Sequence, residues 1–176
     1  MSLDKIIKLE SVLDKTNDWL KFAEAKNGAV LAFNGAVLFA LSRLVSTANF
    51  ASNWLHIYLM FVSFLLLVSI VIALSSFVPR LEAPYWIKYP ELPSKFNLIF
   101  YGHICSLSAK KYLELFNDAE GKNKTEGKLA EDIANQIVIN SKISYIKYEQ
   151  FRIAVWFTLS ALLTPIGAYF LANSKQ

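Results

Sequence analysis

The chain has 176 residues, of which 55% are hydrophobic and 18% are charged, and its formal net charge is +4. This composition fits a mostly helical membrane protein and leaves room for only one further small cytosolic module. The single cysteine, Cys105, excludes an intramolecular disulfide framework.

Residues 3–26 are expected to form an amphipathic cytosolic helix, because apolar side chains recur at steps of three, four and seven. Those side chains are Ile6, Leu9, Leu13, Leu20 and Ala23. Neither proline nor glycine interrupts the segment before Gly28. The helix should therefore continue into the first apolar stretch as one rod.

Three apolar stretches, residues 28–42, 55–78 and 153–172, are each nearly free of charge. The middle stretch would span roughly 36 Å as a helix, which exceeds a hydrocarbon core of about 30 Å. The first stretch is short enough to be a buried core helix, but Arg43 can extend toward a headgroup layer. We interpret residues 27–78 as a transmembrane helical hairpin and residues 153–172 as a third span.

Two faces of these spans are expected to pack closely in lipid. The first carries the small residues Gly28, Ala32, Gly35 or Ala36, and Ala40. Asn34 lies on a different stripe near the middle of its span, where a buried amide should bond to another helix. In the third span, Ser160, Thr164 and Gly167 form a weakly polar seam, which favours interhelical packing, with a pore lining as the alternative. This packing surface predicts a homo-oligomer.

The segment 79–124 is expected to be a cytosolic connector that begins with Pro79 and Arg80 at the end of the second span. Its proline-rich, aromatic residues 84–93 suit the membrane interface. Residues 96–104 should be a short strand or an extended connector. A helix over 110–116, capped by Ser106 or Ser108, and a loop over 117–124 should follow.

A single helix is expected from Thr125 to Ala172, because apolar residues keep helical spacing up to the membrane entry at Arg152. Such a helix would be roughly 70 Å long and would place some 40 Å of stalk below the membrane. The stalk needs a partner, for which we expect residues 3–26 and copies of the stalk itself.

Basic residues predict the orientation in the membrane. Five Lys or Arg residues lie in 1–26, one in the 43–53 loop, eleven in 79–152 and one after 172. The positive-inside rule therefore places the N-terminus and residues 79–152 in the cytoplasm and the C-terminus outside.

Motifs of phosphate-loop, triad or zinc-hydrolase chemistry do not occur, so we expect no enzyme and no cofactor. His103 and Cys105 are too few for a metal site. Ligand-binding chemistry is most varied around the 97–112 segment and the stalk. The candidate ligand-binding residues are Asn97, Tyr101, His103, Lys110, Asp132 and Gln136, which combine an aromatic ring, amides, an acid and a base.

Several short segments together resemble the Pycsar transmembrane effector family. They are Glu24-Ala25-Lys26, LAFNGA at 31–36, Pro79-Arg80, NLIFYGHI at 97–104, LAED at 129–132, Gln136-Ile137 and Lys147-Tyr148. The match covers most of residues 20–172. This resemblance implies an all-α membrane protein of the bacterial inner membrane with an antiphage role, in which a neighbouring cyclase makes cyclic UMP or cyclic CMP and the effector damages the membrane.

The preferred function is thus a ligand-gated membrane effector whose partners are lipid, a cyclic nucleotide and further copies of itself, with no nucleic-acid polymer. The alternative is a constitutive small membrane scaffold, or an accessory subunit of a transporter or channel. It would show the same hydropathy without toxicity. A membrane-bound enzyme would require a catalytic histidine or carboxylate pair in a cleft.

Overall fold

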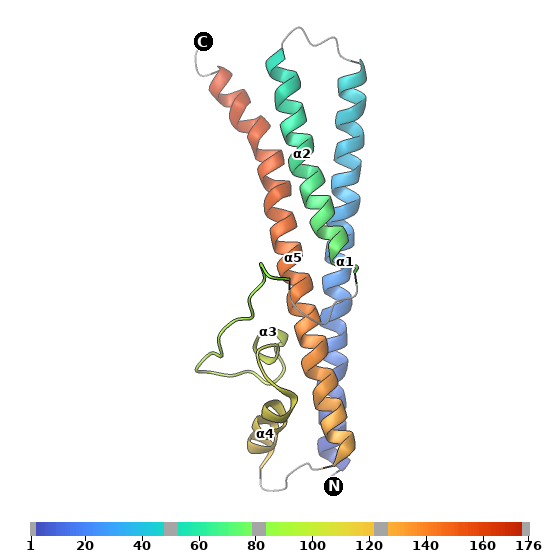
Figure 1. Cartoon of the computed structure of the whole chain (residues 1–176), viewed down its shortest axis with the longest axis vertical. Helices are drawn as coiled ribbons and strands as arrows, with labels where there is room; N and C mark the ends of the chain where they lie inside the picture. The colour runs from blue at the N-terminus through green and yellow to red at the C-terminus, as the bar shows by residue number, and fades with distance from the viewer. Residues whose placement is uncertain (1–2, 48–52, 79–83, 122–126, 174–176) are drawn as a thin grey trace. The chain divides into compact units, whose positions relative to one another are not determined.

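The structure is a computed structural model that describes residues 3–47, 53–78, 84–121 and 127–173, and their side chains in 4–46, 55–78, 84–121 and 127–164. Its elements are α1 (Leu3–Thr47), α2 (Asn53–Ser75), α3 (Tyr101–Ile104), α4 (Ala109–Glu120) and α5 (Lys128–Asn173) (Figure 1). The described residues contain no strand, so the predicted all-α class is confirmed.

The chain divides into two compact units. The connector unit comprises residues 1–24 and 79–149, and the span unit comprises residues 25–78 and 150–176. Two long helices, α1 and α5, each contribute residues to both units. The prediction that residues 3–26 continue without a break into the first apolar stretch is confirmed, because α1 is one helix from Leu3 to Thr47.

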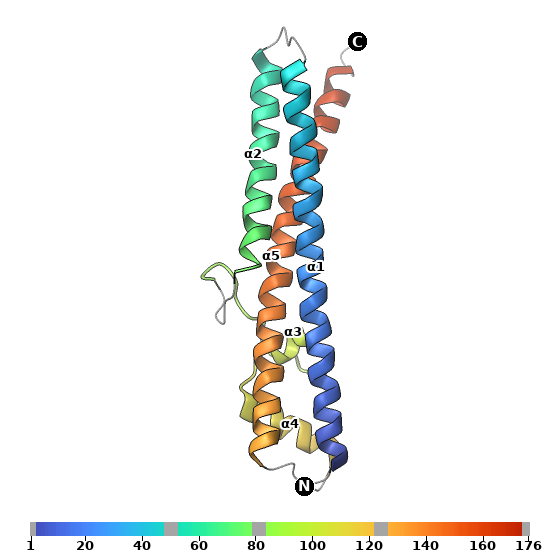
Figure 2. The same ribbon diagram turned by 90° about the vertical axis from the view of Figure 1, so that its right-hand side faces the viewer.

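The connector unit has an apolar core to which three helices contribute: the first half of α1, the whole of α4 and the first half of α5. The first halves of α1 and α5 run side by side in the same direction (Figure 2). Leu9, Ile104, Tyr112 and Ile137 are fully buried in it. Burying apolar surface stabilises at about 25 cal/mol per Å², so these large side chains contribute much of the stability. The Tyr112 hydroxyl also donates to the Leu98 carbonyl at 3.1 Å, which satisfies its polar end.

The α4 helix begins where Ser108 caps it, since the Ser108 hydroxyl accepts from the Lys111 backbone N–H at 3.2 Å. Of the two caps predicted, Ser108 is correct, while the Ser106 hydroxyl instead donates to the Pro90 carbonyl. The helix is longer than expected and ends at Glu120, so the prediction of a loop over 117–120 is wrong. Gly121 follows it with a φ of +87°, which glycine adopts without strain. The rest of the expected loop, 122–124, lies outside the described residues.

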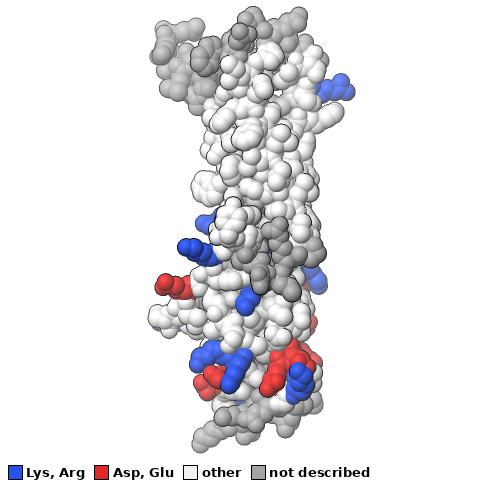
Figure 3. All heavy atoms as spheres, viewed as in Figure 1, with Lys and Arg blue, Asp and Glu red and all other residues white. Residues whose placement is uncertain are grey.

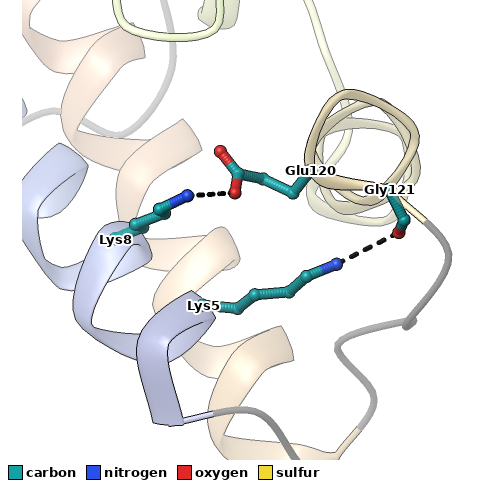
Figure 4. Close-up of polar contacts among 4 residues, drawn as sticks. All are labelled: Lys5, Lys8, Glu120 and Gly121. Atoms are coloured by element: carbon teal, nitrogen blue, oxygen red, sulfur yellow. Dashed lines mark hydrogen bonds and ion pairs between the residues drawn. The ribbon is translucent and has the colours of Figure 1, made fainter.

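The far end of α4 is held by α1 (Figure 4). Lys5, a residue that is only 7% exposed, donates from its ammonium group to the Gly121 carbonyl at 3.2 Å. Beside it, Lys8 forms an ion pair with Glu120. A cation at the carboxyl end of a helix complements the partial negative charge of the helix dipole, so these contacts fasten α4 to the first turns of α1.

Residues 96–104 differ from the expected strand or extended connector, because Tyr101–Ile104 forms the single helical turn α3. The Asn97 side chain explains the turn: its Oδ1 accepts from the backbone N–H groups of Ile99 and Phe100, at 2.8 and 3.2 Å. A side chain that bonds its own following backbone favours a turn over a strand.

The span unit contains α2, whose sequence has no charged residue (Asn53–Ser75). Charged side chains gather instead over the connector unit (Figure 3). Large apolar side chains of α2 are exposed, among them Ile57, Met60, Phe64 and Val71. By length and composition, two helices of the described residues are candidate spans, one within Asp4–Ser46 and the other over Leu55–Ser75. The α5 helix is not one of these two, which differs from the three spans expected.

Helix ends differ from the predicted boundaries for local reasons. The α2 helix ends at Ser75, and the backbone N–H groups of Ser76, Phe77 and Val78 then bond in tighter turns. Pro79 and Arg80 lie outside the described residues. The α5 helix begins at Lys128 rather than Thr125, because Gly127 has a φ of +126° that is incompatible with a right-handed helix.

Candidate functional site

Two of the six candidate ligand-binding residues, Asn97 and His103, bond within the α3 turn. In addition to the two hydrogen bonds that its side chain accepts from Ile99 and Phe100, Asn97 donates its backbone N–H to His103 Nδ1 at 3.1 Å. The His103 ring also packs edge-on against Phe100, with ring centroids 5.1 Å apart. Both side chains therefore hold the turn together.

Tyr101 belongs to an aromatic cluster. Its ring stacks on that of Tyr148, with centroids 4.9 Å apart and planes 16° apart. Trp19 of α1 lies against both rings, at 5.4 and 6.3 Å. Burial, followed by the nearby Tyr148 and Glu149, raises the pKa of Tyr101 to about 12, so its phenol stays neutral at physiological pH.

Gln136 starts a chain of amides that links α5 to α1. Its Nε2 donates to Asn140 Oδ1 at 2.9 Å, and Asn140 Nδ2 donates to Asn17 Oδ1 at 2.7 Å. Because Asn140 is almost fully buried, this chain satisfies an amide inside the connector unit. Gln136 itself remains exposed.

Lys110 and Asp132 come together in a hollow between α4 and α5. Its volume is about 480 Å³, and its lining residues are Ala109, Lys110, Leu113, Lys128, Glu131, Asp132 and Asn135. Within it, Lys128 forms an ion pair with Asp132 at 3.1 Å. The hollow thus offers two ammonium groups, two carboxylates and one amide around a small apolar floor.

A second hollow of about 420 Å³ lies between α1 and the segment that precedes α3, and it is lined by Lys15, Asp18, Trp19, Phe22 and Ile99. It is the more apolar of the two, and its aromatic side chains are partly exposed. Sequence reasoning missed Trp19 here and Asn135 in the first hollow. Trp19 could have been noticed as a large aromatic residue on the polar side of an amphipathic helix. Asn135 does not differ in the sequence from the other polar residues of the stalk.

The span unit holds a buried polar cluster from three helices. Asn34 of α1 donates to Ser69 of α2 at 2.8 Å and to Thr158 of α5 at 3.0 Å. Asn34 and Ser69 are fully buried, and Thr158 is 7% exposed. The expectation that Asn34 bonds to another helix is confirmed, with two helices as partners.

Known proteins identify the family. The family model of the Pycsar effector protein domain (PycTM) matches residues 8–173, almost the whole chain. The chain belongs to the Pycsar effector family. One relative, the Pycsar effector protein PtPycTM of Propioniciclava tarda, is 27% identical over 157 residues, which are 89% of this chain and 72% of the relative. No solved structure matches significantly.

Family membership confirms the resemblance seen in the sequence and supports an antiphage defence effector role for this chain. It also favours a membrane protein, in agreement with the two apolar helices. Among the described residues, no three His, Cys, Asp or Glu side chains gather as a metal site would require.

Cys105 of this Pycsar effector is fully buried, and burial raises the pKa of its thiol to about 11. A thiol with a raised pKa is a poor nucleophile and a poor metal ligand at neutral pH. Its Sγ lies 3.3 Å from the Gly102 carbonyl, to which it donates. Cys105 therefore packs the α3 turn.

The predicted packing residues of the effector's spans lie mostly on exposed surface. Gly35 has open space where a Cβ would be, and Ala32 is exposed. A Cβ on Gly28, in contrast, would lie 3.9 Å from the ring of Phe77, two residues after the end of α2. Ser160 and Thr164 of α5 are exposed too, and the Thr164 hydroxyl donates to the Ser160 backbone carbonyl. The side-chain surroundings of Gly167 lie outside the described residues.

Proposed function

We propose that this chain is an inner-membrane antiphage effector that binds cyclic UMP or cyclic CMP, made by a neighbouring cyclase, and then impairs the membrane. The observation that carries the proposal is the family match over residues 8–173, found in a chain whose α2 exposes large apolar side chains. Exposed apolar surface of this extent is stable in lipid and unstable in water.

The membrane arrangement proposed has three spans: the second half of α1, the whole of α2 and the second half of α5. The third is included because the 153–172 stretch carries no formal charge and has a length of about 30 Å as a helix. The distribution of Lys and Arg supports an N-terminus and residues 79–152 in the cytoplasm, with the C-terminus outside.

The hollow between α4 and α5 is the proposed nucleotide site. Its volume of about 480 Å³ lies within the range of small-molecule pockets, roughly 300–1,000 Å³. Lys110 and Lys128 offer ammonium groups to the cyclic phosphate, and Asn135 can both donate to and accept from a pyrimidine edge. Of the six candidate ligand residues expected from the sequence, Lys110 and Asp132 line this hollow, and the other four are not part of the proposed site.

The link to the membrane is proposed to run through α5. Four of the seven lining residues lie in its first two turns, from Lys128 to Asn135. Since α5 is one unbroken helix to Asn173, a tilt or rotation at its start is carried along the helix instead of being absorbed by a flexible linker.

Dye-loaded liposomes test the proposal. The purified chain should release dye when cyclic UMP or cyclic CMP is added, and Lys110→Ala should weaken the response roughly tenfold or more in nucleotide concentration. Lys111→Ala is the matched control, because Lys111 pairs with Glu114 on α4 and is absent from the hollow's lining. Absence of leakage with every cyclic mono- and dinucleotide would favour the alternative of a constitutive scaffold or accessory subunit.

A further inference from the structure

Side-chain hydrogen bonds link the helices of the span unit to one another. Ser69 of α2 donates to the backbone carbonyl of Ala154 in α5 at 2.7 Å. Six residues further along α2, Ser75 Oγ accepts from Gln150 Nε2 of α5 at 2.9 Å. These two hydrogen bonds join α2 to α5 without any group from α1.

The buried apolar side chains at the centre of the span unit come from α2 and α5. The buried residues of the span core are Val62 and Leu66 of α2 and Ala161 of α5. The side chains that pack against them are only partly buried, and these are Val37, Leu38 and Leu41 of α1 and Tyr58 and Leu65 of α2. The buried centre of this cluster therefore lies between α2 and α5, and α1 contributes only partly buried side chains to it.

Asn34 ties α1 to this pair. Its amide nitrogen donates to Ser69 and Thr158, and its Oδ1 accepts from Thr158 at 3.1 Å. Removing the amide leaves no buried hydroxyl without an acceptor, because the Ala154 carbonyl lies within 2.7 Å of Ser69 and 3.0 Å of Thr158. The pair can thus release α1 and keep its own hydroxyls satisfied.

We propose that α1 is the helix that separates from the α2–α5 pair when the span unit changes its packing, and that Asn34 is the tie that controls this separation. An amide released into hydrocarbon is costly, which keeps the three helices together in the resting state. The inference concerns the span unit alone and goes beyond the proposed function, because it applies whichever ligand acts.

Spin-label distances in nanodiscs test the order of release. Labels are attached in pairs at Phe39→Cys on α1, Phe64→Cys on α2 and Leu163→Cys on α5, all on exposed positions, in a Cys105→Ser background. In Asn34→Leu, the distance distributions of the two pairs that include α1 should broaden or shift. The α2–α5 pair should keep the distribution seen with Asn34 in place.

Two further variants make the test decisive. Ser42→Ala is the matched control, since the Ser42 hydroxyl donates to the Phe39 carbonyl of its own helix, and it should change no distance. Ser69→Ala removes both the hydrogen bond from Asn34 of α1 and the hydrogen bond to the Ala154 carbonyl of α5. All three distance distributions should therefore broaden. The proposal is overturned if Asn34→Leu leaves the α1 pairs unchanged, or if it broadens the α2–α5 pair as much as the others.

Discussion

Glu24 of α1 accepts a hydrogen bond from the Lys147 ammonium of α5 at 2.8 Å, and seven residues earlier on each helix Asn17 accepts from Asn140. A repeat of seven on both helices means that they run in parallel with one register across two turns. The Lys147 side chain is 12% exposed, so the ion pair is partly shielded from water.

The first prediction concerns this ion pair. Glu24→Ala should lower the free energy of unfolding by about 1–2 kcal/mol, between the values for exposed and buried pairs. Circular dichroism during denaturation in mild detergent measures it. The exchanged variant, Glu24→Lys with Lys147→Glu, should recover part of the loss. If the exchange is as unstable as the sum of both single changes, the contribution of this pairing is disproved.

The second prediction concerns orientation. An alkaline-phosphatase fusion after Gln176 should be active in a bacterial host, because it would lie outside the cytoplasm, whereas a fusion at Gly121 should be inactive. A green fluorescent protein fused at the same sites should show the opposite pattern and serves as the control. Activity at Gly121 with none at Gln176 would reverse the proposed topology.

The third prediction concerns self-association, which remains a proposal. Gly35 has open space around the position of a Cβ, so it is free to contact another copy. Gly35→Leu should shift the particle in mild detergent to a smaller oligomer by light scattering. Met60→Leu, at an exposed position of α2, should leave the size unchanged. A wild-type monomer would disprove this prediction.

The fourth prediction concerns alkaline pH. The pKa of Tyr101 in the fold, about 12, exceeds its ordinary value of about 10, so the fold favours the neutral phenol. The stability that Tyr101 contributes through this raised pKa is present below about pH 10 and is lost as the pH rises through about 12. Burial also raises the pKa of Tyr112. The free energy of unfolding should be measured at pH about 9 and at pH about 11. Its decrease between these two pH values should be smaller in Tyr101→Phe than in the wild type.

Sequence patterns predicted the long elements because their causes are local. The absence of glycine and proline before Gly28 was sufficient for α1, and the apolar run was sufficient for α2. The need of Asn34 for a partner also followed from its place in an apolar run. Its partners did not, because Ser69 and Thr158 have hydroxyls that can bond their own helix, and only packing selects them.

The candidate ligand site was less predictable, because the structure does not bring its six expected residues together in one pocket. Asn97 and His103 are used by the α3 turn, which depends on a side chain folding back onto the backbone. Lys110 and Asp132 share a hollow because α4 packs on α5 through Tyr112 and other core residues. Contacts of this kind between distant segments leave no periodic signal in the sequence.

The register shared by Asn17–Asn140 and Glu24–Lys147 also limits how such a chain can change its length over evolution. One residue inserted into α1 between Asn17 and Glu24 would rotate all that follows by about 100°, and Glu24 would turn away from Lys147. A compensating insertion at the matching point of α5, or seven residues in both helices, would restore the contacts. Natural variants that lengthen one of these segments should therefore lengthen the other by the same amount.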